Sequence, residues 1–198
     1  MDIQPFVMGP VATNTYLLSE GEEAIVIDPA SKAEKMIEKI GNRKLLAVLL
    51  THGHFDHIKA CDGLYEKYRC PIYLHAADEE LARDKYSGAA FGLVSYVSCP
   101  TVPLEEGRMK IGDFSFEVIY TPGHTPGSVI YVFDNCIFTG DTLFKGSVGR
   151  TDLKGGNARI LKESLNVFKQ FDRDYLIYPG HEEASTLSSE LANNWFLR

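Results

Sequence analysis

The sequence places four side chains that can bind a metal ion within one short segment, which reads Thr51-His52-Gly53-His54-Phe55-Asp56-His57. Imidazole is the commonest metal ligand in proteins, and carboxylate is its usual oxygen companion. His52 and His54 alternate in an extended stretch, so both can face one side, and Asp56 and His57 can then reach a neighbouring point. A solvated polar loop is the alternative, but it does not explain this density of donors. The segment therefore indicates a metal site.

Three further candidate ligands follow predicted strands elsewhere in the chain, namely His124, Asp141 and His181. His124 lies between two Pro-Gly pairs, which hold it on a stiff, tight loop. Asp141 and His181 each come directly after a glycine at a strand end. Each of the three, taken alone, is typical of a turn. Because loops at strand ends build the sites of open α/β architectures, the repetition of the pattern favours one shared site.

The elements that must position these residues are short strands and amphipathic helices. In the first half we predict strands at 13–18, 24–28, 45–50 and 71–74, with a hairpin turn at Gly21. A helix is expected from Ser31, where Glu34 completes a capping box, and a second from about Ile58. In the second half the predicted strands are 114–120, 128–133, 136–139 and 175–178, with a helix capped by Asn157. Two sheets packed face to face with helices outside would bury these apolar runs, although a doubly wound sheet fits nearly as well.

Length and composition narrow the class of protein. The 198 residues suit one compact domain, 1–198. A net charge of −7 argues against nucleic acid or an anionic membrane as a partner. We therefore expect a small-molecule substrate, and the sequence does not determine the oligomeric state. No apolar stretch is long enough to span a bilayer, and the first residues lack the order of a signal peptide. The four cysteines form no CxxC pair, so we expect reduced thiols and a cytoplasmic location.

Taken together, the motifs resemble those of a known family. The 51–57 segment, the loop at 121–127, Gly140-Asp141-Thr142 and Pro179-Gly180-His181 occur in the order of the metallo-β-lactamase superfamily. Within that superfamily, the chain most resembles the short glyoxalase II-like (hydroxyacylglutathione hydrolase-like) hydrolases. Classical glyoxalase II enzymes carry a helical C-terminal domain that helps to bind glutathione, and the segment after His181 is too short for such a domain. The resemblance implies an α+β fold, the four-layer αββα sandwich with two mixed sheets.

The resemblance also implies a dinuclear metal centre. It assigns His52, His54 and His124 to the first metal and Asp56, His57 and His181 to the second, with Asp141 bridging them. We expect two divalent ions, with zinc as the first choice and iron or manganese as alternatives. The expected reaction is hydrolysis of a small thioester or ester by a metal-bridging hydroxide, which Asp56 orients as the catalytic residue.

The sequence leaves alternative roles for several residues near the expected centre. Arg150 is the natural anchor for a substrate anion, with Lys145 as a second substrate-binding cation, but Arg150 can instead pair with Asp152. Asp28 is expected either to hydrogen-bond near a ligand histidine or to cap a helix. His75, which has no accompanying motif, is expected to start a helix or line a pocket.

Two other functions compete with hydrolysis. The Gly149-Arg150-Thr151-Asp152 run is similar to persulfide dioxygenases, which share the fold and use one iron with O₂. A non-catalytic metal-binding module is the other alternative, although structural metal sites close their coordination and this ligand set leaves positions open.

A long apolar connection at 81–100 is expected to form a mobile flap over the metals. Gly88 and Gly92 can serve as hinges, and Phe91 and Tyr96 are the side chains expected to meet the substrate. A helix docked permanently on the core, or part of a dimer interface, is the alternative.

Overall fold

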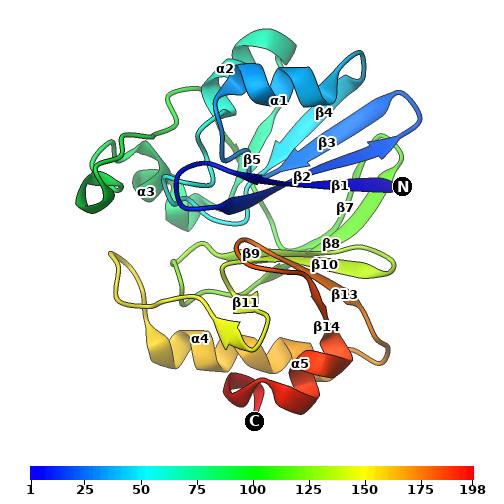
Figure 1. Ribbon diagram of the computed structural model, residues 1–198, viewed down its shortest axis with the longest axis vertical. Helices are drawn as coiled ribbons and strands as arrows, with labels where there is room; N and C mark the ends of the chain where they lie inside the picture. Colours follow the sequence, from blue (N-terminus) through cyan, green and yellow to red (C-terminus); the bar gives the residue numbers. More distant parts are fainter.

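The computed structural model describes residues 1–198 and shows two sheets packed face to face between outer layers of helices (Figure 1). The first sheet has the order β1-β2-β3-β4-β5-β6, in which β1 to β3 are antiparallel and β3 to β6 are parallel. Its strands are Asp2–Met8, Thr13–Glu20, Glu23–Ile27, Lys44–Leu49, Ile72–Leu74 and Val102–Pro103. The hairpin expected at Gly21 joins β2 to β3.

The second sheet has the order β14-β13-β10-β9-β8-β7 and is antiparallel except between β10 and β13. Its strands in chain order are β7 Gly107–Ile111, β8 Phe114–Tyr120, β9 Val129–Val132, β10 Cys136–Gly140, β13 Leu176–Pro179 and β14 Ser185–Thr186. A small separate hairpin pairs β11 Leu143–Phe144 with β12 Ser147–Val148. Each sheet therefore mixes parallel and antiparallel strands, as predicted.

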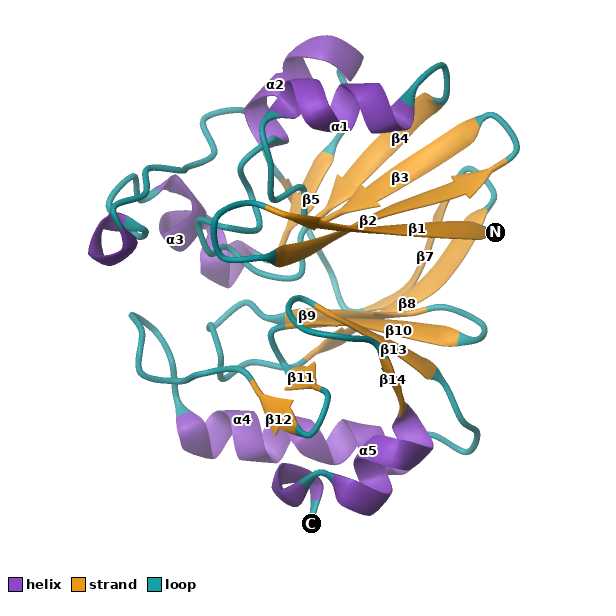
Figure 2. Cartoon of the chain, in the orientation of Figure 1, coloured by secondary structure: helices purple, strands orange, loops and turns teal.

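Helices cover the outer face of each sheet (Figure 2). On the first sheet these are α1 Ala33–Ile40, α2 Cys61–Tyr68 and the short α3 Glu79–Arg83. On the second sheet they are α4 Ala158–Ser164, continued by a 3₁₀ helix Leu165–Gln170, and α5 Leu187–Asn193. Three more 3₁₀ helices cover Ala76–Asp78, Ala89–Phe91 and Trp195–Leu197. No helix has both the length and the apolar character needed to cross a membrane.

Strand alternation explains why the layers stack in this way. In β2, Tyr16 and Leu18 face the second sheet, whereas Leu17 faces the helices. Between the sheets they meet Phe116 and Phe138, and the opposite face of the second sheet packs against the helices through residues such as Ile137. Because strand side chains alternate between two faces, each buried strand supplies two apolar layers. The αββα sandwich expected from the sequence is confirmed.

Some local predictions were wrong. Ser31 does not cap α1, which begins at Ala33 after Lys32 and has no side-chain cap. The backbone just before α1 makes hydrogen bonds to other segments instead. The Ala30 N–H donates to the Thr15 hydroxyl, and the Pro29 carbonyl accepts from the Ala60 N–H. Helix α2 begins at Cys61 rather than near Ile58. By contrast, Asn157 caps α4 through hydrogen bonds from Arg159 and Ile160, as predicted.

Candidate metal centre

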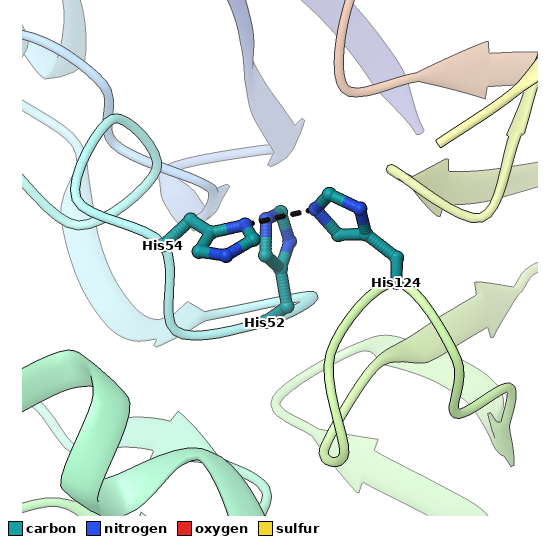
Figure 3. Close-up of side chains that lie close together, drawn as sticks. All are labelled: His52, His54 and His124. Atoms are coloured by element: carbon teal, nitrogen blue, oxygen red, sulfur yellow. Dashed lines mark hydrogen bonds between the residues drawn. The ribbon is translucent and has the colours of Figure 1, made fainter. Parts of the chain in front are cut away.

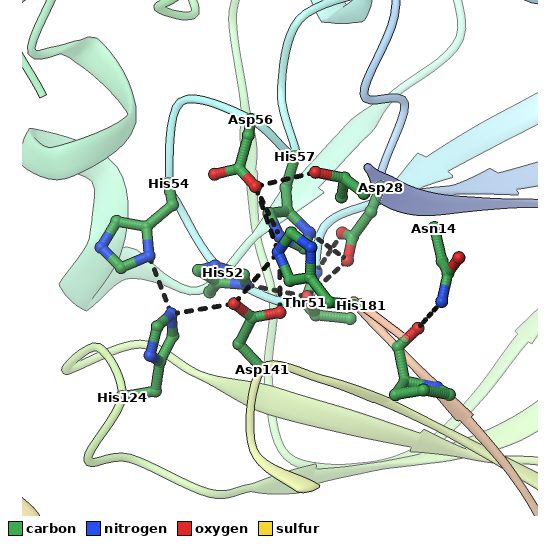
Figure 4. A network of polar contacts seen from close by, with 12 residues as sticks. Asn14, Asp28, Thr51, His52, His54, Asp56, His57, His124, Asp141 and His181 are labelled. Atoms are coloured by element: carbon green, nitrogen blue, oxygen red, sulfur yellow. Dashed lines mark hydrogen bonds and ion pairs between the residues drawn. The ribbon is translucent and has the colours of Figure 1, made fainter. Parts of the chain in front are cut away.

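The candidate ligands lie in loops at the carboxyl ends of strands from both sheets. The loop after β4 carries His52, His54, Asp56 and His57, while the β8–β9 loop carries His124. Asp141 directly follows β10, and His181 follows β13 two residues after its end. Figure 4 shows these side chains converging from the two sheets on one point. The sandwich thus brings together all seven residues that the sequence singled out.

One group of donors consists of three buried imidazoles. A nitrogen from each of His52, His54 and His124 lies within 4.8 Å of the others, and Nδ1 of His54 is 2.8 Å from Nε2 of His124. Figure 3 shows the three rings turned towards a common point. Neutral imidazoles have little reason to converge in this way unless they share a proton or a cation, so the group has the geometry of a metal-binding triad.

A second group consists of Asp56, His57 and His181, whose donor atoms also lie within 4.8 Å of one another. Oδ2 of Asp56 is 3.4 Å from Nε2 of His57 and 3.2 Å from Nε2 of His181. Asp141 lies between the two groups. Its Oδ1 is 3.4 Å from Nε2 of His57, and its Oδ2 is 3.4 Å from Nε2 of His124. Asp141 is therefore placed to contribute to both groups.

Unpartnered atoms at this centre test whether a metal fits. Nε2 of His52, Nε2 of His57 and Oδ1 of Asp141 are buried and have no hydrogen-bond partner, whereas the other such atoms in the chain are serine hydroxyls. A buried polar atom without a partner is costly, so an arrangement that orphans three of them in one place needs an explanation. A divalent cation supplies the missing partner to each, and the nitrogen and oxygen donors suit such an ion. The residues present therefore fit a metal.

The ionisation of His52, His54 and Asp56 agrees with that role, whereas at His57 and His181 the neighbouring Asp56 and Asp141 outweigh burial and raise the pKa of both imidazoles. Burial lowers the pKa of His52 well below its usual value and that of His54 to about 3, so both are neutral imidazoles at neutral pH. Burial alone would raise the pKa of Asp56, but the neighbouring His57 and His181 outweigh it and hold that pKa well below its usual range. Neutral imidazole and ionised carboxylate are the forms that bind metals.

Three hydrogen bonds fix the orientation of the ligand rings. Nδ1 of His57 is 2.9 Å from Oδ2 of Asp28, and Nδ1 of His124 is 2.7 Å from the carbonyl oxygen of Arg150. His52 makes the third bond, to the Thr51 hydroxyl at 3.0 Å. A proton on Nδ1 of His57 and His124 leaves Nε2 free to face the centre.

Asp28 therefore has the first of the two roles expected for it. Besides orienting His57, its carboxylate accepts hydrogen bonds from the Thr51 N–H at 2.8 Å and the Thr51 hydroxyl at 2.6 Å. Asp28 forms a candidate donor group with His52 and His57 as well, but its oxygens already accept these hydrogen bonds. It caps no helix, because α1 begins five residues later.

Asp78 is a site residue that sequence reasoning missed. It ends a 3₁₀ helix, and its buried carboxylate accepts hydrogen bonds from the Gly53 N–H, the Thr125 hydroxyl and the Gly127 N–H at 2.8, 2.6 and 2.7 Å. Asp78 thus joins the loop of His52 and His54 to the loop of His124. In the sequence it looks like an ordinary acidic residue in a first helical turn, and only its burial sets it apart.

Two glycines allow the loops to approach this closely. A Cβ atom on Gly180 would collide with Oδ1 of Asp141, and one on Gly140 would collide with the Thr51 hydroxyl. Gly140 also has a φ of +48°, in the left-handed region that other residues rarely adopt. The glycine before each of Asp141 and His181 is therefore required by packing at the centre.

A cavity of about 120 Å³ opens onto the donors. Five of the candidate ligands line it together with Arg150 and four apolar side chains, which are Val11, Phe55, Phe91 and Leu153. Arg150 also makes a two-bond ion pair with Asp152, at 2.6 and 2.8 Å, so both roles weighed for it are compatible with its position. A second cavity of about 460 Å³ shares Phe55 and Asp56 with the first and carries three lysines, Lys32, Lys35 and Lys59.

Other sequence-predicted residues lie away from the donors. Lys145 lines neither of these cavities, and its exposed Nζ pairs with Glu183 at 2.7 Å. His75 starts the 3₁₀ helix at Ala76, where its Nδ1 accepts from the Ala77 N–H at 3.3 Å, in line with the helix-start role expected for it.

The expected flap contributes one aromatic residue to the site. Phe91 lines the 120 Å³ cavity and stacks on Phe55 with ring centroids 5.4 Å apart. Tyr96 is 47% exposed and lines neither cavity, so its expected contact with the substrate stays a prediction. Residues 93–95 form part of the larger cavity, with Lys59 donating to the Val94 carbonyl.

Comparison with known proteins agrees with this architecture. Residues 8–181 match the family described as the metallo-beta-lactamase superfamily, and the chain belongs to that superfamily. Among its relatives is a probable metallo-hydrolase, YqgX, from Bacillus subtilis, which is 34% identical over 96% of this chain and 94% of its own.

Two solved structures are similar over almost their whole length. The BLEG-1 B3 metallo-beta-lactamase has a TM-score of 0.92 and 35% identity, with 99% of both chains covered. TTHA1623, solved in a di-iron-bound form, has a TM-score of 0.89 and 37% identity, covering 98% of this chain and 100% of its own.

Proposed function

We propose that the protein is a dinuclear metal-dependent hydrolase that cleaves a small thioester or ester. The observation that carries the proposal is the division of seven donors into two groups with Asp141 between them. His52, His54 and His124 would hold one ion, Asp56, His57 and His181 the other, and Asp141 both. When bound, divalent ions acidify a water molecule towards neutral pH and polarise a carbonyl oxygen.

The residues of the chain would prepare the reaction by positioning. The Thr13 hydroxyl donates to Oδ2 of Asp56 at 2.8 Å, which fixes the carboxylate that we assign to orienting the attacking water. Phe91, Val11 and Leu153 surround the reacting group with apolar surface and exclude other water. A thiolate leaving group needs no strong acid, because thiols have low pKa values compared with alcohols.

Basic side chains favour an anionic substrate. Arg150 lines the cavity at the donors, and Lys32, Lys35 and Lys59 line the larger cavity, which shares Phe55 and Asp56 with it. A thioester in the smaller cavity could extend its remaining part along these lysines, with a carboxylate or phosphate paired to them. Zinc is our first choice of metal, and iron is the alternative that the di-iron form of TTHA1623 supports.

Thiol release and oxygen uptake should be measured together to test the function. Protein loaded with zinc should release thiol from lactoyl thioesters in a sealed, anaerobic cell. Asp56→Asn should lower kcat by at least about 100-fold while the protein still folds, as expected for a group that acts in the reaction step. Oxygen consumption with glutathione persulfide by protein holding one iron would instead establish the dioxygenase. Stable metal content without any turnover would leave a metal-binding module.

A further inference from the structure

A cavity of about 660 Å³ lies among the helices of the second sheet, and the proposed reaction does not use it. One wall is the stretch from Val148 to Thr151, and a second is α4 with the start of the 3₁₀ helix that follows it. The C-terminal residues Trp195, Phe196 and Arg198 complete it. Its volume lies within the range of small-molecule sites in proteins, roughly 300–1,000 Å³. Arg150 is the one residue that it shares with the cavity at the metal centre.

The charge of this cavity opposes that of the whole chain. Three basic residues line it and no acidic residue does, although the chain has a net charge of −7. Arg150 is paired with Asp152 and Arg198 donates to the Ala192 carbonyl at 3.2 Å, but neither Lys162 nor Arg198 forms an ion pair with a side-chain carboxylate. Two cations without a side-chain carboxylate partner at the wall of a cavity attract an anion.

The same cavity presents aromatic surface to solvent. Trp195 is 73% exposed and Phe196 is 48% exposed. The Arg198 guanidinium lies 5.8 Å from the centroid of the Trp195 ring, which places a cation beside an accessible aromatic face. A flat ring of a ligand can stack on such a face, and an anionic group attached to it can then reach the cations.

We propose that this cavity binds a small anionic molecule with a flat aromatic ring, of the chemical class of nucleoside phosphates. The ring would lie against Trp195, and the phosphates would pair with Lys162 and Arg198. A second copy of the chain is a poorer occupant. A two-fold contact over this face would place its cations opposite one another.

The position of Arg150 links this site to the metal centre. Arg150 lines both cavities, and its carbonyl oxygen accepts the hydrogen bond from His124. A bound phosphate would draw the Arg150 guanidinium away from Asp152. It would thereby act on the same residue whose carbonyl oxygen orients the candidate ligand His124.

Trp195 itself provides the assay, because it is the only tryptophan in the chain. ATP should be titrated into metal-loaded protein with excitation near 295 nm, and free tryptophan should correct for absorption by the nucleotide. We expect a saturable change in Trp195 emission, with inorganic phosphate and adenosine each at least ten-fold weaker than ATP. Absence of a saturable response at millimolar ATP overturns the proposal.

Paired variants separate this site from nucleotide bound at the metals. The double variant Lys162→Ala, Arg198→Ala should raise the apparent Kd for ATP at least ten-fold, with metal content and far-UV circular dichroism unchanged. Lys169→Ala removes an exposed cation that does not line the cavity and should leave the Kd unchanged. An ATP response that survives the double variant contradicts the assignment. So does sedimentation showing dimers that Trp195→Ala disrupts while ATP has no effect, because that face would then be an interface between copies. Neither measurement depends on hydrolysis, so the proposal stands or falls separately from the proposed function.

Discussion

The carboxylate of Asp78 accepts a hydrogen bond of 2.6 Å from the hydroxyl of Thr125, 47 residues further along the chain. Asp78 lies beyond the end of the first sheet's β5, whereas Thr125 is in the loop between two strands of the second sheet. The same carboxylate also holds Gly53, between His52 and His54. One buried side chain therefore ties the two loops that carry the first group of donors.

Replacing Asp78 by Asn should destabilise the protein and weaken metal binding. The amide cannot accept from all three donors, and a buried donor left without a partner costs about 1–3 kcal/mol. We therefore expect a free energy of unfolding lower by about that amount, measured by urea titration, together with lower metal content after dialysis. Glu80→Gln, which changes an exposed carboxylate near by, is the matched control and should behave as wild type. Unaltered stability in Asp78→Asn would show that the link is dispensable.

Metal stoichiometry should follow the two donor groups. Elemental analysis after full metal supply should approach two equivalents per chain. His124→Ala and His181→Ala should each lose mainly one ion, and Asp141→Ala should weaken both, because its carboxylate lies between the groups. A firm value of one equivalent in the wild type would rule out the dinuclear centre.

Phe91 and Tyr96 should differ in their effect on catalysis. Phe91 lines the cavity at the donors, whereas Tyr96 belongs to the same connection and lines neither of the two cavities near them. Phe91→Ala should raise the substrate KM several-fold with kcat and metal content nearly unchanged, as expected when uniform binding is lost. Tyr96→Ala should keep wild-type kinetics. Equal effects of the two substitutions would argue against a specific wall at Phe91.

Asp62 should control the mobility of the 84–98 segment. From α2, its carboxylate accepts hydrogen bonds from the Ser98 N–H, the Ser98 hydroxyl and the Cys99 N–H. Asp62→Ala should therefore increase hydrogen exchange in 84–98, measured by mass spectrometry. Glu66→Gln, on the same helix, should leave exchange unchanged. Protection that persists in Asp62→Ala would mean that other contacts hold the segment.

The pH dependence of this anchor has a definite sign. Burial tends to raise the pKa of Asp62, but the hydrogen bonds from Ser98 and Cys99 outweigh burial and lower the pKa below its ordinary value of 3.8. A lowered pKa in the folded state contributes stability above the unfolded value, and that stability is lost as pH falls through the folded pKa. Hydrogen exchange in 84–98, corrected for the intrinsic rate, should therefore not vary with the ionisation of Asp62 above about pH 5.

Sequence patterns were sufficient for the donors, whereas the choice of layers came from the family resemblance. Strands with apolar residues on both faces, such as β4, require cover on each side, and both a face-to-face sandwich and a doubly wound sheet provide it. Histidines and aspartates in glycine-marked loops at strand ends stand out by residue type and spacing, so His52 and Asp141 could be found without coordinates. The strands β1 and β7 were missed. They are half-exposed edge strands, so they lack the continuous apolar run that marks a buried strand.

Only the tertiary structure decided which polar residues support the donors. Asp78 and Lys145 look alike in sequence, as charged residues near turns, yet the first is buried between two loops and the second pairs with Glu183 at the surface. Asp28 could have been a cap or a support, and its contact with His57 settles the choice. Likewise, Trp195 comes to line one cavity with α4 only after the chain has folded back on the second sheet. Residue type and short-range spacing reveal what a side chain can bind. Which partners it meets depends on packing between segments far apart in the chain, and local pattern carries no record of that.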